Sequence, residues 1–146
     1  MTDTEFPVRR TNDEIPAQSG QVQVVKPISA DLSITLDKTE AGIPILQVAG
    51  EIDMRTAPDL RVRVDQTTAS AEFLVLDLTG VEFLASAGLS ILVELARQAR
   101  ETGLRWGVVA TGRAVLRPIE AVGLLSVIPV YPAVTDAVAG INAGQA

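Results

Sequence analysis

The stretch from residue 73 to residue 110 most constrains the fold of this 146-residue chain. It opens with an unbroken apolar run at residues 73–76, which is typical of a strand covered on both faces. From residue 87 to residue 102, apolar side chains recur at helical spacing with charged side chains between them. Residues 104–110 are again mostly apolar. Strand, helix and strand at this spacing predict a βαβ unit with parallel strands and a right-handed crossover.

The segments around this unit predict further strands and helices. Residues 32–36 alternate apolar and polar side chains, and residues 43–49 follow after a glycine-containing turn, so the two predict a hairpin. A helix is expected from Thr56 to about residue 68, with Thr56 and Asp59 as a capping box. A helix, a short edge strand and a last helix are then expected at residues 112–125, 127–132 and 133–141. The order ββαβαβαβα predicts an α/β sheet of four or five strands with about four helices.

The two ends of the chain differ from this patterned region. Residues 1–30 mix charges of both signs with three prolines and have no hydrophobic period, so we expect a flexible tail there. One domain is expected over residues 31–141, followed by a C-terminal tail at residues 142–146.

Composition excludes several classes of protein. The chain has no cysteine and no histidine, which excludes disulfides, thiolate zinc sites and histidine acid–base catalysis. The net charge is −6 and there is no basic run, so nucleic-acid binding is not expected. No apolar stretch reaches the ~20 residues of a membrane span, and the N-terminus is polar. We therefore expect a cytoplasmic protein without membrane insertion.

No cofactor or metal site is expected. Neither of the common glycine-rich phosphate-binding motifs is present, so a nucleotide cofactor has no predicted cradle. Glu51 and Asp53 lie two residues apart, but two carboxylates without a third ligand make a weak metal site.

Ser86 lies between two alanines where the buried strand leads into the helix. One interpretation is a helix cap, because serine oxygens accept bonds from first-turn amides. A nucleophile is disfavoured, because no histidine is present to take its proton. A third interpretation is a phosphorylation switch, since a phosphate of about −1.5 to −2 charges is favoured at a helix N-terminus. The cap and the switch are compatible, and both stay open at this point.

Three stretches resemble the anti-sigma factor antagonists of the STAS domain family: GEIDMRTAPDL at 50–60, LVLDLTGVEFLASAGLSIL at 74–92, and residues 103–138. The most specific pieces are GEID at 50–53, DLTGVEF at 77–83 and SAGL at 86–89. The resemblance implies the SpoIIAA-like STAS fold, a small mixed sheet packed against several helices. It also implies a function without catalysis: the antagonist binds a kinase-type anti-sigma factor and so frees a sigma factor for transcription.

In switching members of the family, the anti-sigma factor phosphorylates a serine at this helix start, binding ends, and a serine phosphatase restores it. Ser86 matches that acceptor position, and Asp53 matches a neighbouring acidic residue. Gly88 is expected to let the partner's backbone approach. The resemblance implies a partner-binding surface formed by Gly50, Glu51, Ile52, Asp53, Thr56, Ala57, Pro58, Leu84, Ala85, Ser86, Ala87, Gly88, Leu89 and Ser90.

Two residues depart from the family pattern. Family members usually carry an acidic residue before the serine and a hydroxyl residue after it, whereas this chain has Ala85 and Ala87. These departures keep a second prediction open, a non-switching STAS subunit of a stress-signalling or lipid-transport complex. In that case Ser86 would be a cap or a contact within the complex.

Overall fold

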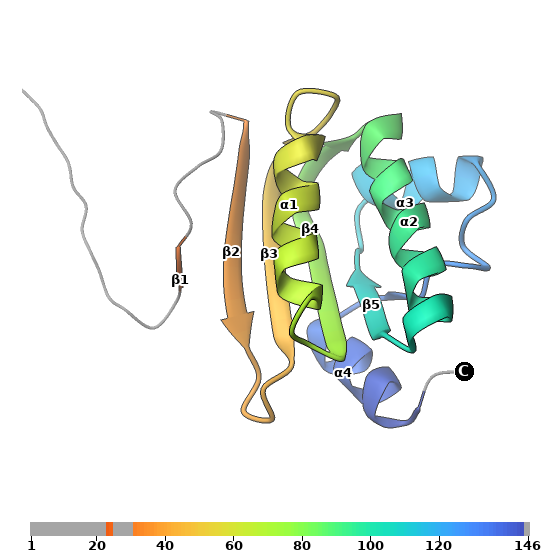
Figure 1. Ribbon diagram of the computed structural model, residues 1–146. Coiled ribbons are helices and arrows are strands. Elements are labelled where there is room, and N and C mark those ends of the chain that lie inside the picture. The colour runs from red at the N-terminus through yellow and green to blue at the C-terminus, as the bar shows by residue number, and fades with distance from the viewer. Residues whose placement is uncertain (1–22, 25–30, 145–146) are drawn as a thin grey trace, which may run out of the picture.

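The computed structural model describes residues 23–24 and 31–144 (Figure 1). The other residues of the predicted N-terminal tail lie outside this description, as do residues 145 and 146 of the predicted C-terminal tail. Two details differ from the expected boundaries. Strand β1 (Gln23–Val24) lies within the stretch expected to be a tail, and the last helix includes Asn142.

The six strands lie in the sheet in chain order. β1 pairs antiparallel with β2 (Leu32–Lys38), and β2 pairs antiparallel with β3 (Pro44–Ile52), which confirms the predicted hairpin. From β3 onward the neighbours are parallel: β4 (Phe73–Leu84), β5 (Arg105–Val109) and β6 (Val130–Tyr131). The sheet is therefore mixed, and β2 to β6 are the five strands that the sequence predicts.

Four helices cover the two faces of the sheet unequally. The helices α1 (Ala57–Thr68), α2 (Ser86–Thr102) and α3 (Arg113–Ala121) each join neighbouring parallel strands in the same direction. Because such crossovers are right-handed, all three helices pack on one face, and their buried side chains share one core cluster. The helix α4 (Val134–Asn142) packs on the other face, behind the sheet in Figure 1.

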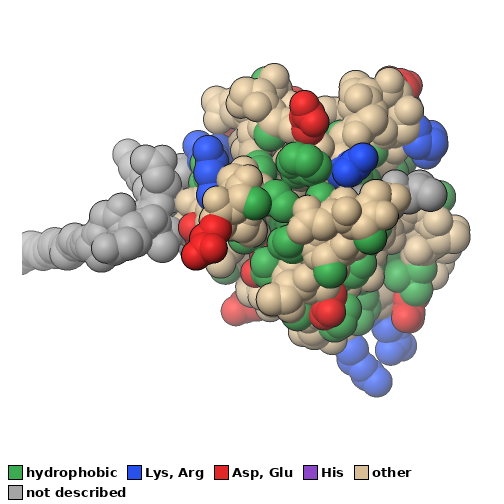
Figure 2. Space-filling model, turned by 90° about the horizontal axis from the view of Figure 1, so that it is seen from below, with side chains coloured by type: hydrophobic (Ala, Val, Ile, Leu, Met, Phe, Trp, Pro, Cys, Tyr) green, Lys and Arg blue, Asp and Glu red, His purple; other side chains and the backbone are tan. Residues whose placement is uncertain are grey.

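The main core is built almost entirely from leucine, isoleucine, valine and alanine, with Trp106 as its aromatic member. A second, smaller cluster of buried side chains beneath α4 includes Val75 and Val109. Figure 2 views the molecule from the end where the β2–β3 turn and α4 lie, and apolar side chains gather there between scattered charged ones. Within residues 31–144, no helix has the length and apolar character needed to span a bilayer.

Two features of β4 were not predicted. The register of β4 against β3 shifts between Gln47 and Ala49, and again between Gly50 and Glu51. Such bulges bend a strand and increase its twist. Past them, β4 still reaches the end of β3, so that Leu84 lies opposite Ile52 and α2 begins immediately afterwards.

Candidate partner-binding site

The candidate site lies where β3 and β4 end side by side. Because the two strands are parallel, the loop at residues 53–56 and the first turn of α2 emerge from the same edge of the sheet. The backbone N–H of Ala85 donates to the carbonyl oxygen of Ile52 at 2.8 Å. This bond joins the two segments that the sequence predicted to lie together.

Thr56 holds the loop from below. Its side chain is fully buried, at 0% exposure. Its Oγ1 donates to the carbonyl oxygen of Glu51 at 2.8 Å and accepts the N–H of Asp53 at 3.0 Å. The predicted capping box is wrong, because Thr56 makes no side-chain cap bond to α1 and its backbone is already helical. The hydroxyl serves the end of β3 instead of the helix.

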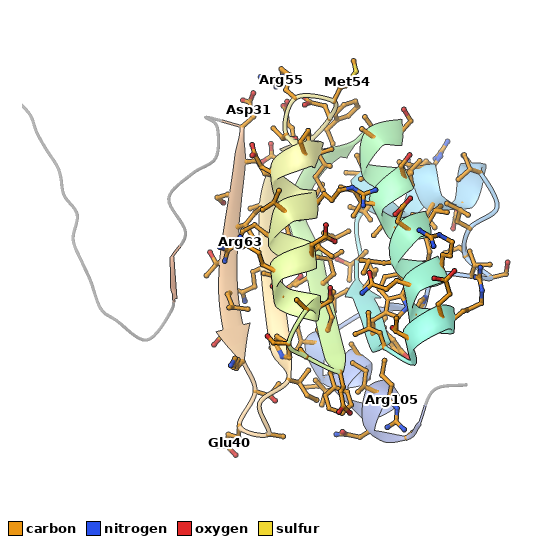
Figure 3. The ribbon with its side chains drawn as sticks, viewed as in Figure 1. Asp31, Glu40, Met54, Arg55, Arg63 and Arg105 are labelled. Carbon is orange, nitrogen blue, oxygen red and sulfur yellow. The ribbon has the colours of Figure 1, made fainter. Side chains whose placement is uncertain are left out.

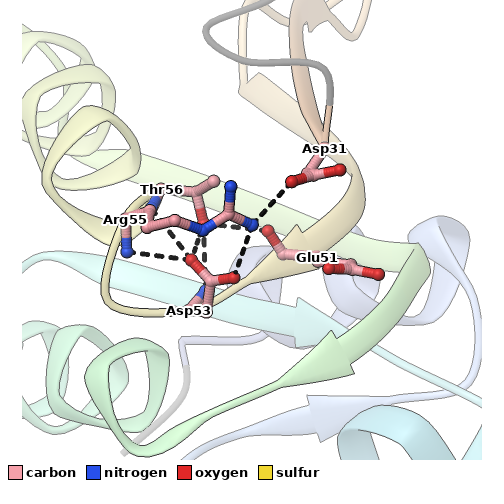
Figure 4. Close-up of polar contacts among 5 residues, drawn as sticks. All are labelled: Asp31, Glu51, Asp53, Arg55 and Thr56. Carbon is pink, nitrogen blue, oxygen red and sulfur yellow. Dashed lines mark hydrogen bonds and ion pairs between the residues drawn. The ribbon is translucent and has the colours of Figure 1, made fainter.

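The Asp53 carboxylate and the Arg55 guanidinium lock the same loop, as Figure 4 shows. Asp53 Oδ1 accepts the backbone N–H groups of Arg55 and Thr56 at 2.9 and 3.2 Å. Arg55 Nη2 donates to Asp53 Oδ2 at 2.9 Å and also to Asp31 Oδ2 at the start of β2. The hydrogen bond from Arg55 is the main reason that the pKa of the Asp53 carboxyl lies below its ordinary value. Asp53 is therefore ionised at neutral pH and paired within its own chain.

Met54 projects from this locked loop. Its side chain is 81% exposed, the largest exposure among the large apolar side chains of the described residues. Figure 3 shows Met54, Arg55 and Asp31 together at one end of the molecule, with Glu40 and Arg105 at the other. The loop thus presents an apolar side chain between two residues that are held by ionic contacts.

Ser86 is the first residue of α2, and its side chain is exposed. The helix cap is Ala85, with φ −90° and ψ 175°, and no side chain caps the helix. The cap interpretation of Ser86 is therefore wrong, because the helix begins one residue earlier than predicted. Among the described residues, Ser86 Oγ has no hydrogen bond, while the Ser86 carbonyl accepts Ser90 Oγ at 3.1 Å. The hydroxyl is open to solvent beside first-turn amides that have no acceptor within the helix.

Gly88 has a different role from the one predicted. It is buried, and a Cβ placed there would overlap Leu84 Cδ1 and lie 2.7 Å from Ile52 Cγ2. The space that a side chain would fill is taken by the chain's own strand ends. The expectation that a partner's backbone approaches Gly88 is therefore wrong, and the glycine instead lets α2 sit close against β3 and β4.

The structure brings all the predicted partner-binding residues to this edge but divides them by exposure. Five are buried and support the surface from below: Ile52, Thr56, Ala57, Leu84 and Gly88. The others are at least partly exposed: Gly50, Glu51, Asp53, Pro58, Ala85, Ser86, Ala87, Leu89 and Ser90. We call the exposed set, together with Met54, the switch face.

Sequence reasoning missed three residues of this site. Met54 and Arg55 lie within the quoted stretch 50–60, where a methionine in a polar turn after a strand was the available signal. Asp31 lies 24 residues before Arg55, and nothing in the local sequence links the two. Gly50, with φ 108°, explains how they meet: a Cβ there would overlap the carbonyl oxygen of Asp31, so only glycine allows this close approach of β2 and β3.

The fold and this edge define a class of protein. The family model described as the STAS domain matches residues 36–137, and the chain belongs to the STAS domain family.

Particular relatives refine this assignment. The anti-sigma-F factor antagonist RsfB of Mycobacterium tuberculosis is 35% identical over 120 residues, which cover 81% of this chain and 98% of RsfB. The crystal structure of an anti-sigma factor antagonist from Mycobacterium paratuberculosis is 35% identical, with a TM-score of 0.69, covering 80% of this chain and 99% of that one. The anti-sigma factor antagonist SpoIIAA in its unphosphorylated form shares the fold, with a TM-score of 0.63 at 12% identity, over 75% of this chain and 96% of SpoIIAA.

Proposed function

We propose that this protein is a cytoplasmic anti-sigma factor antagonist that binds a serine-kinase-type anti-sigma factor and so frees a sigma factor for transcription. The observation that carries the proposal is the 35% identity to an anti-sigma-F factor antagonist over 98% of that relative's length. The protein itself contributes binding and not catalysis. Histidine is absent from the sequence, so the chain has no histidine base that would make Ser86 a catalytic nucleophile.

The switch face is the surface that we assign to this partner. Met54 and Leu89 offer apolar contact area, and Asp53 and Arg55 on either side of Met54 are already paired within the chain. A loop held by Thr56, Asp53 and Arg55 loses little conformational entropy when a partner docks. Such preorganisation favours affinity without a large interface.

Phosphorylation of Ser86 is the switch in this proposal. The Ser86 Oγ attacks the γ-phosphorus of ATP held by the partner, a new O–P bond forms, and ADP leaves as the bond to its bridging oxygen breaks. The hydroxyl proton goes to a base of the partner. The helix N-terminus accommodates the phosphate, since unpaired amides and the helix dipole favour an anion there. The added charge would lie one helical turn from Leu89 on α2, and removing it from water costs binding energy.

The test measures binding to a panel of purified kinase-type anti-sigma factors. Wild type should bind at least one of them and acquire a phosphate at Ser86 in the presence of ATP, detected by mass spectrometry. Ser86→Ala should bind and acquire no phosphate, and Ser86→Glu should bind about tenfold or more weakly. Ser70→Glu is the matched control, because it adds the same charge to an exposed serine after α1, away from the switch face. Failure of wild type to bind any of these factors would refute the proposal.

A specific observation keeps the second candidate function in view. Ala85 and Ala87 flank Ser86 without the acidic and hydroxyl groups that the resemblance leads one to expect. A non-switching STAS subunit of a stress-signalling or lipid-transport complex would bind its partners equally well as wild type and as Ser86→Glu. Affinity capture from the native host that returns transporter or signalling subunits, and no anti-sigma kinase, would favour this alternative.

A further inference from the structure

A groove of about 580 Å³ lies between the C-terminal half of α2 and the segment that joins α3 to β6. Ala96, Ala99 and Arg100 line it from α2, and residues 125–129 line it from the opposite side. Trp106 of β5 is buried and also lines it. The two alanines are small, which leaves room between the helix and the facing segment.

The segment that joins α3 to β6 holds apolar side chains outside the core. Leu125 and Val127 are 45% and 46% exposed and line the groove, and Val122, shortly before them in the chain, is 57% exposed. Their positions are fixed, because the N–H groups of Val127 and Ile128 both donate to the carbonyl oxygen of Leu124, at 3.1 and 3.0 Å, and the Ile128 side chain is buried. A patch of exposed apolar side chains with polar residues around it is typical of an interaction surface.

The charged side chains of the groove are of one sign. Arg100 and Arg105 line it, whereas no aspartate or glutamate of the described residues does. Both arginines are exposed, and neither forms an ion pair with another described residue, although Arg97 on the same helix pairs with Glu94 and Glu101. In a chain with a net charge of −6, the groove is therefore a local positive site whose charge complements an acidic ligand.

The extent of the patch favours a polypeptide over a small acid. Val122 is exposed but does not line the groove, so a ligand confined to the groove would leave it uncovered. A peptide segment can cover the whole patch and place carboxylates against both arginines at once. We propose that this groove is the docking site for an acidic segment of a second partner protein. Its carboxylates bind Arg100 and Arg105, and its aliphatic side chains cover Leu125 and Val127.

The groove and the switch face lie at different ends of α2. Ser86 is the first residue of the helix, and Arg100 lies in its last turn, about 21 Å further along the axis. Figure 3 shows Arg105 at the end of the molecule opposite to Met54. No residue of the groove belongs to the switch face. The two surfaces can therefore be occupied at the same time, and the second partner does not depend on the proposed function.

Selection from a library of short random peptides tests the charge of the groove with the full chain. Peptides retained on wild type are sorted by whether they also bind Arg100→Gln/Arg105→Gln. The peptides lost with this variant should be rich in acidic and aliphatic residues. Arg113→Gln/Arg117→Gln makes the same change at two exposed arginines of α3 outside the groove, and should retain them. The proposal is overturned if no peptides are lost with the first variant, or if those lost are not acidic.

The apolar part of the groove is tested with one of the peptides lost in that selection. Its affinity for the full chain is measured by fluorescence anisotropy. Leu125→Ser/Val127→Ser should weaken binding about tenfold or more, because the aliphatic contacts are removed. Val62→Ser makes the same kind of change at an exposed position of α1 and should leave the affinity unchanged. Equal affinity of Leu125→Ser/Val127→Ser and wild type would overturn the proposal.

A second copy of the chain is the competing occupant of the groove. Analytical ultracentrifugation of wild type and of Leu125→Ser/Val127→Ser over a range of concentrations distinguishes the two. Monomers in both cases are expected, since the groove is then free for another protein. A wild-type dimer that the double substitution dissociates would show that a second copy covers the groove, and would overturn the proposal. None of these measurements uses an anti-sigma factor, so this inference and the proposed function fail separately.

Discussion

The two ends of α1 differ in how their polar groups are satisfied. At its start, Thr56 is fully buried with both of its hydrogen bonds made, and Asp53 and Arg55 are paired with each other. Toward its other end, Arg63 has a buried Nε atom without a partner, beside an open cleft. At the first end these polar groups are satisfied within the chain, and this surface is suited to presenting Met54 and Ser86 to another protein. The second end holds a buried donor without an acceptor, which lowers stability by about 1–3 kcal/mol.

The largest effect on stability is expected where α2 packs on the ends of β3 and β4, at the same end of the molecule as the switch face. Gly88→Val should lower the free energy of unfolding by about 3 kcal/mol, because the new side chain overlaps Leu84 and Ile52. Urea denaturation followed by circular dichroism measures this loss. Ala87→Val adds similar bulk one position earlier, where the side chain is partly exposed, and should cost less than about 1 kcal/mol. Equal losses in the two variants would contradict the packing described for Gly88.

Thr56→Val tests the hydrogen bonds below the loop. The valine has the shape of threonine but leaves the Glu51 carbonyl and the Asp53 N–H without their buried partner, at a cost of about 1–3 kcal/mol. The same denaturation experiment reports the change. Thr67→Val is the matched control, because its hydroxyl bonds only to the Arg63 carbonyl within the helix, and it should change stability by about 0.5 kcal/mol or less. If Thr56→Val left the free energy of unfolding unchanged, the two ends of α1 would not differ in how their polar groups are satisfied.

Arg63→Met tests the unpartnered donor toward the other end of α1. Removing a buried donor that has no acceptor should leave the free energy of unfolding within about 0.5 kcal/mol of wild type, or raise it. Thermal denaturation of wild type and variant measures this difference. A loss of more than about 1 kcal/mol would show that the Arg63 guanidinium is satisfied in the native protein.

The smallest effect concerns the titration of Asp53. Its pKa lies below the ordinary value of 3.8, so the stabilisation from its ionised form is complete above that value and is lost as the pH falls through the lower native pKa. Arg55→Gln removes the hydrogen bond that contributes most to this shift, and should move the pKa of Asp53 up toward 3.8. Carbon-13 NMR of the Asp53 carboxyl group, recorded as a function of pH, measures this pKa directly. The control Arg97→Gln removes an ion pair on α2 and should leave the titration of Asp53 unchanged.

Much of the fold could be predicted from the sequence because burial leaves a periodic pattern in it. The alternation at residues 32–36 and the apolar runs of β4 and β5 predicted a hairpin and a βαβ unit, and the structure confirms both. Arg97 and Glu101, four residues apart on α2, form an ion pair at 3.2 Å that helical spacing alone brings together. These features depend on residues close together in the sequence.

The parts of the site that were missed depend on distant residues. The partner of the Thr56 hydroxyl is a carbonyl of the preceding strand, and its position follows from the register of β3 and β4. The role of Gly88 depends on Ile52 and Leu84, which meet only in the folded sheet. The contact of Arg55 with Asp31 requires the close approach of β2 and β3 at Gly50. None of these contacts leaves a periodic signal.

The sequential order of the strands has a consequence for how the protein folds during its synthesis. Each strand from β2 to β6 joins the sheet beside the one made just before it, so no strand has to be inserted between two that are already paired. Each parallel pair therefore closes across one intervening helix, as Ile45 does with Val75 and Val108 with Val130. As the polypeptide leaves the ribosome, both segments of the switch face are available once α2 has emerged, before β5, β6 and α4 have been synthesised.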